Sequence, residues 1–243
     1  MKNWIVYSML SMGLLILVGC GNVKLDPNEF SANKKECKKG DVKGCYVSGL
    51  MYKKGVGTRK SYYRAKRALK LACKHKNYAG LTYQEKEYSN DACNELGVLN
   101  TKGLGGGRSY ANAKKLFYKA CKNNYAKSCS NLGTLYREGK GTRRNHITAT
   151  AYFNKGCNNG DKKGCYELGL SYLMGQGVKH NYTKARTSFI KACDSNHALA
   201  CFNVGSLYEN GHGVAEDNTK AKEYYKKACD NGLKIGCSSY KRR

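Results

Sequence analysis

The residues with the clearest chemical potential in this sequence are its cysteines, 13 in 243 residues. Apart from Cys20 they form six consecutive pairs, five with members eight residues apart and one, Cys73 and Cys93, with members twenty apart. An even set of this density is typical of disulfide-bonded proteins outside the cytoplasm. Structural zinc is the alternative, but it uses short Cys-x-x-Cys spacings that this sequence lacks. The predicted disulfides are Cys37–Cys45, Cys73–Cys93, Cys121–Cys129, Cys157–Cys165, Cys193–Cys201 and Cys229–Cys237.

Catalytic groups are far less evident. Ser-x-x-Lys, which carries the nucleophile of serine β-lactamases, occurs three times, but its companions Ser-Asp-Asn and Lys-Thr-Gly are absent. A metal-dependent hydrolase needs clustered His and Asp, whereas the five histidines are scattered. We therefore expect no metal and no cofactor and assign no catalytic residue. The three motif matches are Ser31/Lys34, Ser188/Lys191 and Ser238/Lys241, and the histidines are His75, His146, His180, His197 and His212.

A 36-residue period organises the chain around these cysteines. From Cys121 onward the first member of each pair recurs every 36 residues, and so do a glycine four residues after each second cysteine, a Gly-x-Gly, and an alanine eight residues before the next cysteine. Such self-similarity indicates a solenoid. The step from Cys73 to Cys121 is 48 residues, so one unit contains a twelve-residue insertion.

Each unit has the pattern of a helical hairpin. In 201–229, Val204, Leu207 and Tyr208 have helical spacing, Gly211 and Gly213 favour a turn, and Asp217 or Asn218 is suited to cap a second helix. One hairpin buries too little apolar surface alone, so the units must stack. A cysteine at the end of one helix and another at the start of the next would then be close enough to bond.

These motifs resemble the Sel1-like repeat, a relative of the tetratricopeptide repeat. The stretch "LGLSYLMGQGVKHNYTKARTSFIKAC" (168–193) fits it closely, and the cysteines eight apart resemble the Helicobacter cysteine-rich protein family. The resemblance implies an all-α, disulfide-stapled solenoid of αα-hairpins wound as a right-handed superhelix. It also implies penicillin binding and slow β-lactamase activity. Asn100 departs from the repeat, because tyrosine stands at the equivalent Tyr52, Tyr136, Tyr172 and Tyr208.

The N-terminus indicates export. A fourteen-residue apolar run, Ile5 to Val18, ends in "LVGC", which resembles a bacterial lipobox. We expect a signal peptide over 1–19, lipid on Cys20 and an extracytoplasmic protein tethered to a membrane, the outer membrane being favoured, or released; an uncleaved signal anchor is the alternative. The expected organisation continues with a linker (20–26), a half-repeat helix (27–44), repeats at 45–73, 93–121 after an enlarged turn (74–92), 129–157, 165–193 and 201–229, and a capping helix (230–243).

Charge is uneven along the repeats. The chain has 44 Lys+Arg against 17 Asp+Glu, and residues 37–72 hold eleven basic residues and one acidic residue. This basic end suits anionic lipid or an acidic wall polymer, or it is simply a solvated surface. Nucleic acid is excluded because no recognition motif appears and the chain is expected outside the cytoplasm. The candidate contacts are Lys53, Lys54, Arg59, Lys60, Arg64, Lys66 and Arg67.

The favoured function is a monomeric scaffold that binds a peptide, a peptidoglycan fragment or a partner protein; the alternative is the slow β-lactamase of the resemblance. Related solenoids bind peptides on the concave face formed by the first helix of each hairpin. The polar residues that we place two positions before the repeat glycine of each unit would line that face. The candidate groove residues are Ser48, Glu95, Asn131, Glu167 and Asn203, which could equally be solvated surface.

Overall fold

The computed structural model describes residues 23–75 and 78–242, so the expected signal peptide and Cys20 lie outside the described residues. The described part is all-helical and contains no strand. A short 3-10 helix, η2 (Pro27–Glu29), precedes the α-helices, which are α1 (Phe30–Lys39), α2 (Val42–Lys54), α3 (Tyr62–Cys73), α4 (Tyr83–Lys102), α5 (Tyr110–Lys122), α6 (Ala126–Glu138), α7 (His146–Asn158), α8 (Lys162–Met174), α9 (Tyr182–Asp194), α10 (Ala198–Glu209), α11 (Asn218–Asp230) and α12 (Lys234–Arg242).

The helices form five hairpins with one extra helix at each end, as the sequence predicts. We call α2, α4, α6, α8 and α10 the first helices and α3, α5, α7, α9 and α11 the second helices. Every second helix starts at a polar cap; Asp217, for example, accepts a hydrogen bond from the Lys220 N–H (2.9 Å). Both glycines of each Gly-x-Gly have positive φ, and the second of them packs closely against a preceding helix, as Gly213 does against Tyr182 of α9.

The repeat glycines on the first helices allow the two helices of a hairpin to touch. A Cβ at Gly97 would lie 2.4 Å from the ring of Phe117, and one at Gly169 would lie 2.5 Å from the ring of Phe189. Phe117, Phe153 and Phe189 are almost fully buried at these contacts. The glycines are therefore packing residues, and a larger side chain there would separate the hairpin.

Each predicted cysteine pair lies at disulfide distance, with Cα atoms 4.3–4.7 Å apart. In every pair the first cysteine stands on, or at the end of, one helix, and the second stands on the next helix, near its start except for Cys93, which lies in the middle of α4. The pair Cys73–Cys93 also closes, across the insertion. The disulfides thus join successive hairpins, and they join α1 and α12 to the ends of the array.

The expected enlarged turn over 74–92 needs correction, because the helix α4 already begins at Tyr83. Thr82 and Glu85 form a capping box: Thr82 Oγ1 accepts from the Glu85 N–H (3.3 Å) and the Glu85 carboxylate accepts from the Thr82 N–H (2.9 Å). The Ser89 hydroxyl then donates to the Ala72 carbonyl (2.9 Å), which holds the extension against α3. Most of the insertion therefore lengthens a helix.

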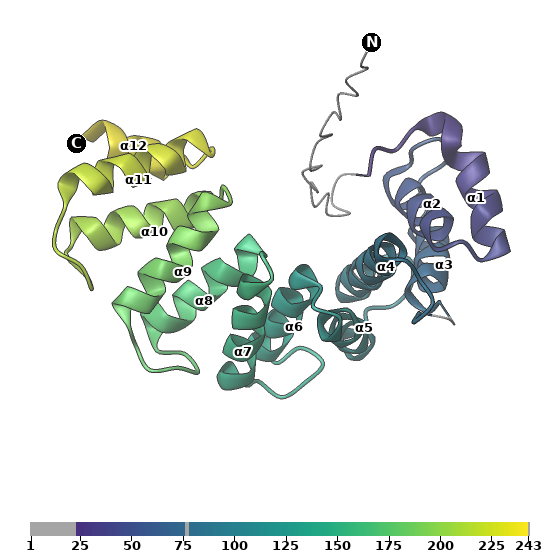
Figure 1. Cartoon of the computed structure of the whole chain (residues 1–243), viewed down its shortest axis with the longest axis horizontal. Coiled ribbons are helices and arrows are strands. Elements are labelled where there is room, and N and C mark those ends of the chain that lie inside the picture. The colour runs from purple at the N-terminus through teal and green to yellow at the C-terminus, as the bar shows by residue number, and fades with distance from the viewer. Residues whose placement is uncertain (1–22, 76–77, 243) are drawn as a thin grey trace, which may run out of the picture.

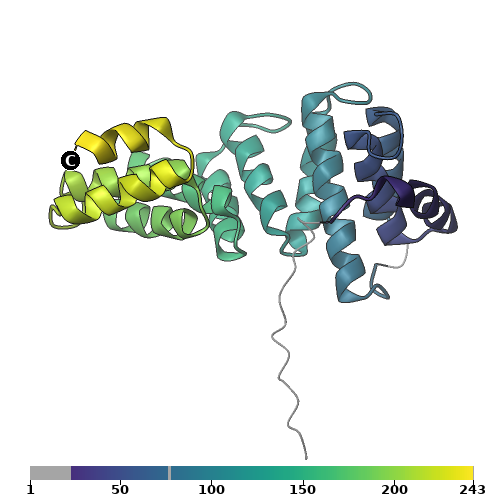
Figure 2. The ribbon, with the colours of Figure 1, turned by 90° about the horizontal axis from the view of Figure 1, so that it is seen from above.

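The hairpins follow one another in an open arc, with the C-terminal helices facing the N-terminal ones across it (Figure 1), and the turned view shows the same row of hairpins from above (Figure 2). First helices contact one another between hairpins, α2 with α4 and α6 with α8, whereas second helices make at most marginal contact with one another. The first helices therefore form the concave side, as Figure 1 shows for α2, α4 and α6. Within the described ranges, no helix has the length and apolar character needed to span a bilayer.

Candidate functional site: the concave face

Four of the five predicted groove residues lie at matching positions of successive first helices. Glu95, Asn131, Glu167 and Asn203 stand two residues before the repeat glycines of α4, α6, α8 and α10. Each of these side chains interacts with a neighbouring first helix. Together they form a polar line along the concave face, which we call the ladder.

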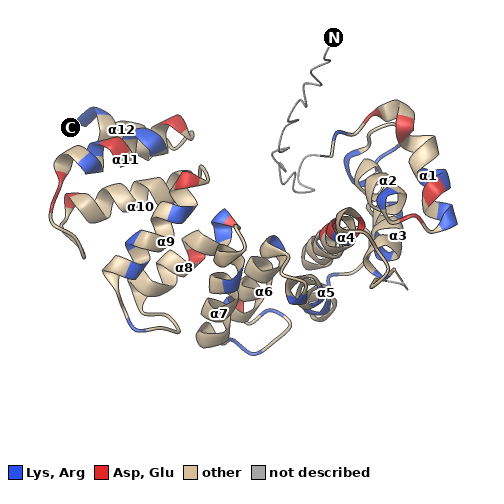
Figure 3. Ribbon diagram, viewed as in Figure 1, with Lys and Arg blue, Asp and Glu red and all other residues tan. Residues whose placement is uncertain are grey.

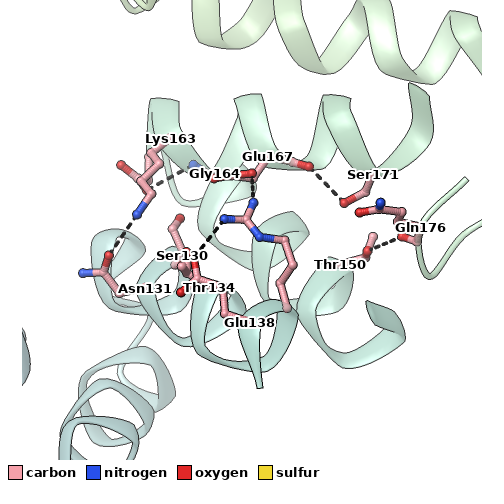
Figure 4. Close-up of polar contacts among 12 residues, drawn as sticks. Ser130, Asn131, Thr134, Glu138, Thr150, Lys163, Gly164, Glu167, Ser171 and Gln176 are labelled. Atoms are coloured by element: carbon pink, nitrogen blue, oxygen red, sulfur yellow. Dashed lines mark hydrogen bonds and ion pairs between the residues drawn. The ribbon is translucent and has the colours of Figure 1, made fainter. Parts of the chain in front are cut away.

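The two glutamates of the ladder are held by cations from the preceding first helix. Lys53 on α2 forms an ion pair with Glu95, and Arg137 on α6 forms one with Glu167. The Glu167 side chain is only 10% exposed and that of Glu95 is 21% exposed. Figure 4 shows Glu167 on α8 receiving the guanidinium from below. These pairs fix one hairpin against the next.

The amides of the ladder also bridge helices. The Asn131 amide donates to Asn94 Oδ1 on α4 (2.9 Å), and its own oxygen lies 3.4 Å from the Lys163 ammonium on α8, the contact drawn in Figure 4. Asn203 makes a side-chain hydrogen bond with Tyr166 of α8. Asn131 and Asn203 are only partly buried, so amide groups that pair well with a peptide backbone remain near solvent.

Ser48 does not belong to the ladder. It stands one residue before Gly49, so Val47 occupies the matching position of α2. The Ser48 side chain is 1% exposed, and its hydroxyl donates to the Cys45 carbonyl (3.3 Å). Val47 is itself only 3% exposed, and every residue of α2 from Gly44 to Tyr52 is buried, so this hairpin presents no exposed position to the ladder.

A pocket of about 290 Å³ opens next to Asn131, where α4 and α6 diverge. Val98, Phe117 and Leu135 supply its apolar wall. Thr101, Lys102, Asn131, Thr134, Glu138, Lys140 and Lys163 supply polar groups, and Tyr110 completes the lining. A small apolar space surrounded by amides, hydroxyls and charges of both signs is suited to one side chain of an extended peptide.

The charge of Glu138 at this pocket is set by its neighbours. Burial acts to raise the pKa of its carboxyl, but the hydrogen bond and charge of Lys140 and the charge of Arg137 outweigh it, and the pKa lies below its ordinary value. The Lys140 ammonium is 2.7 Å from the Glu138 carboxylate. Glu138 is therefore ionised at neutral pH.

An acidic stripe that the sequence analysis did not identify runs along α4. Glu87, Asp91 and Glu95 are one helical turn apart, and Asp91 is 4% exposed. Burial raises the pKa of Asp91, although hydrogen bonds from the Tyr125 and Tyr46 hydroxyls act to lower it. Burial, and then the Asp91 charge, raise the pKa of Glu87. The four-residue spacing was visible in the sequence, but only the α4 extension makes it one helical face.

The predicted basic contact residues are spread over α2, the loop that follows it and α3. Lys53 is used in the ladder, Lys60 lies over the ring of Tyr62, and Arg64 lies over the ring of Tyr52. Lys54 stands in the last turn of α2, and Arg59 precedes α3 in the loop. Lys66 and Arg67 lie on the outer side of α3. There they line a pocket together with other basic residues that the prediction did not include.

The residues considered for catalysis stay apart. Ser31 is on α1, Ser188 on α9 and Ser238 on α12. Ser188 is 6% exposed and its hydroxyl donates to the Lys184 carbonyl of its own helix (2.8 Å), so it is a packing residue. Among the histidines, His197 caps α10, while His180 and His212 pack against Tyr182. No group of three metal-ligating side chains occurs in the described residues.

Comparison with known proteins identifies the class. The profile of the Sel1 repeat matches residues 42–77, 90–125, 126–161, 162–197 and 198–233, well over half of the chain. The chain therefore belongs to the Sel1 repeat family. A search of curated proteins returned no match.

Solved Sel1-repeat structures are similar to this fold. One is c5321, a protective antigen of uropathogenic Escherichia coli with 26% identity and a TM-score of 0.75 over 88% of this chain, which spans 43% of that protein. A Sel1 repeat protein from Oxalobacter formigenes has 24% identity and a TM-score of 0.71, covering 88% of this chain and 84% of its own. Cysteine-rich protein B of Helicobacter pylori is 28% identical, with a TM-score of 0.44, over 55% of this chain and 98% of its own.

Proposed function

We propose that this protein is an extracytoplasmic scaffold whose concave face binds an extended peptide segment, from a partner protein or from a peptidoglycan fragment. The observation that carries the proposal is the pocket between α4 and α6 beside Asn131. Its apolar wall would take one ligand side chain, while Asn131 and Asn203 are spaced along the ladder to pair with the backbone.

The location follows from the cysteines. Six disulfides in a chain of this size are typical of an oxidising compartment outside the cytoplasm. The relative c5321 is described as a protective antigen, which accords with exposure outside the cell. We further propose that Cys20 carries a lipid that tethers the scaffold. Mass spectrometry of membrane-derived protein should find the lipid on Cys20, and Cys20→Ser should release the protein from the membrane.

Two probes test the concave face: a displayed library of linear dodecapeptides and a soluble disaccharide-tripeptide from peptidoglycan. Asn131→Leu with Thr134→Leu should fill the pocket and weaken binding of the selected peptide, or of the muropeptide, by about tenfold or more. Asn154→Leu, at an exposed position of the second helix α7, is the matched control and should bind as the wild type does. An affinity that is unchanged in both variants would show that the ligand binds elsewhere and would refute the proposal.

The same protein preparations test the β-lactamase activity implied by the resemblance. The dispersed serines described above give that activity no assembled nucleophile in residues 23–75 and 78–242, so we expect no nitrocefin turnover that follows the pure monomer through successive columns. Turnover that co-purifies with the monomer would establish an enzyme. Its nucleophile would then be identified by mass spectrometry of the acyl adduct.

A further inference from the structure

A second pocket, independent of the concave face, lies between the second helices α3 and α5. Its volume is about 460 Å³. Leu96 and Asn100 from α4, Leu116 from α5 and Tyr63 from α3 are part of its lining, as is Gly105. Tyr63 is 63% exposed, which is unusual for a large aromatic side chain. The pocket thus combines an apolar wall with an opening to solvent on the outer side of the arc.

This repeat lacks a pair of stacked aromatic residues that two other hairpins have at the matching place. Where α4 and α5 have Asn100 and Leu116, the hairpin α6/α7 has Tyr136 stacked on Tyr152, with ring centroids 5.6 Å apart. The hairpin α10/α11 likewise stacks Tyr208 on Tyr224, at 5.8 Å. Two smaller side chains leave the space open. Asn100 is 6% exposed, and its oxygen accepts a hydrogen bond from the Lys66 ammonium (2.9 Å).

Five cations and no acid line this pocket: Lys66, Arg67, Lys70, Lys74 and Lys115. In the described part of the chain, none of the five forms an ion pair with a carboxylate. The Lys66 and Lys70 positions are one turn apart on α3, and Lys74, the C-cap residue of α3, is one turn further along. Their like charges repel one another, so the free protein is less stable here than it would be with an anion bound.

A neighbouring lysine shows the effect of this charge. The Lys119 ammonium donates to the Cys73 carbonyl (2.5 Å) at the end of α3. Burial, and next the charge of Lys74, lower the pKa of Lys119. Burial is the main cause, and the positive charge of Lys74 adds to it.

The C-terminal pair of second helices, α9 and α11, lacks this basic lining. When Cys73 is aligned with Cys193 and Cys121 with Cys229, the five cations correspond to Arg186, Thr187, Ile190, Asp194 and Glu223. The matching positions between α9 and α11 therefore carry one cation and two acids. Figure 3 shows basic residues on α3 and α5, and residues of both charges at the C-terminal end of the arc. A uniformly lysine-rich surface would not give this difference.

We propose that the pocket between α3 and α5 binds a ligand carrying two or more phosphate groups. A phosphate carries up to two charges, so two of them would neutralise most of the lining in a space of a few hundred Å³. Lysines act as point charges for phosphate, and the planar guanidinium of Arg67 offers two parallel donors. Tyr63 and Leu116 would contact the ring or glycerol body that carries the phosphates. Free polyphosphates and lipid headgroups share this chemistry.

Titration calorimetry on the oxidised full chain tests the proposal with two probes: inositol hexakisphosphate, which is soluble, and phosphatidylcholine vesicles containing cardiolipin. Lys74→Asp with Lys115→Glu copies the matching residues between α9 and α11. We expect about a tenfold or greater loss of affinity for whichever probe binds. The control, Lys234→Asp with Lys241→Glu, makes the same change of net charge on α12 and should leave the affinity within about twofold.

Binding of inositol hexakisphosphate that only the pocket variant loses would support the proposal with a soluble ligand. Binding of cardiolipin vesicles alone, lost in the same variant, would support it with a lipid headgroup. The proposal fails if neither probe binds, if the pocket variant binds as the wild type does, or if both variants lose affinity equally. Because all four substituted positions are exposed, melting curves should show every variant folded. Failure here would leave the concave-face proposal intact, since its probes and variants are different.

Discussion

The first two hairpins and the last two have the same backbone design but differ on their outer side. Both have capped second helices, positive-φ glycines and disulfides between hairpins. Between α3 and α5, however, small side chains leave an open pocket lined by cations, whereas between α9 and α11 the stacked pair Tyr208 and Tyr224 occupies the matching place. The repeat fixes the scaffold, and a few substitutions at fixed positions decide what each surface can bind.

The largest effect we expect is on the disulfides, which allow the two ends to be compared directly. On the chain-entropy relation, removing Cys193–Cys201 as a double serine variant should cost about 2.5 kcal/mol, and removing Cys73–Cys93, with its longer loop, about 3.3 kcal/mol. Urea unfolding followed by circular dichroism measures both. If the two variants lose the same stability, or if the Cys193–Cys201 variant loses more, strain or residual structure in the unfolded chain outweighs loop length.

The ladder ion pairs should differ in strength because they differ in burial. Arg137→Met retains packing over Phe153 but leaves Glu167 buried without its cation, which should cost about 2 kcal/mol. Lys53→Met leaves the more exposed Glu95 unpaired and should cost about 0.5–1 kcal/mol. The same unfolding assay compares them. Adding Glu167→Gln to Arg137→Met should recover part of the loss; no recovery would mean that packing, not charge, is responsible.

A smaller difference concerns the caps of the first helices. Asp41 caps α2, whereas His197 caps α10 through Nδ1 and stacks on Tyr166. Burial, and then the charge of Lys162, lower the pKa of His197. Since the folded pKa lies below the unfolded one, the stabilisation is complete above the unfolded value, about 6.5, and is lost as pH falls through the folded pKa.

We therefore expect the melting temperature to fall by about 1–2 °C as pH drops below about 6.5, beyond the change common to all variants. His197→Asn keeps a capping side chain without a titrating group and should remove this component. Differential scanning calorimetry across that pH range measures it. An unchanged pH profile in the variant would show that His197 does not contribute.

Much of the fold follows from local sequence. The paired cysteines, the Gly-x-Gly turns and caps such as Asp217 are short-range signals, and they predicted the hairpins, the end helices and the disulfide partners. The helical extension before Cys93 was not predicted, because the insertion was interpreted as a turn. In the structure a capping box starts a helix within that insertion. Ser48 was misplaced because this stretch of α2 is buried on all sides, including Val47 at the matching position.

The pockets were much less predictable. Lys70 and Lys74 are 45 and 41 residues from Lys115 in the sequence, and only the stacking of α3 on the α4/α5 hairpin brings them together. The change at Asn100 was visible as a departure from the repeat. Its consequence, an open space beside five cations, depended on Leu116 at the partner position and on the approach of α3.

The most direct test of the comparison is to fill the outer pocket without changing its charge. Asn100→Tyr with Leu116→Tyr installs the stacked pair of the hairpins α6/α7 and α10/α11 and leaves all five cations in place. Binding of the phosphate probe, inositol hexakisphosphate or the cardiolipin vesicle, would be measured by calorimetry beside a melting curve. We predict a folded variant with affinity reduced about tenfold or more. A folded variant that binds as tightly as the wild type would show that surface charge alone attracts the ligand, and would contradict the account.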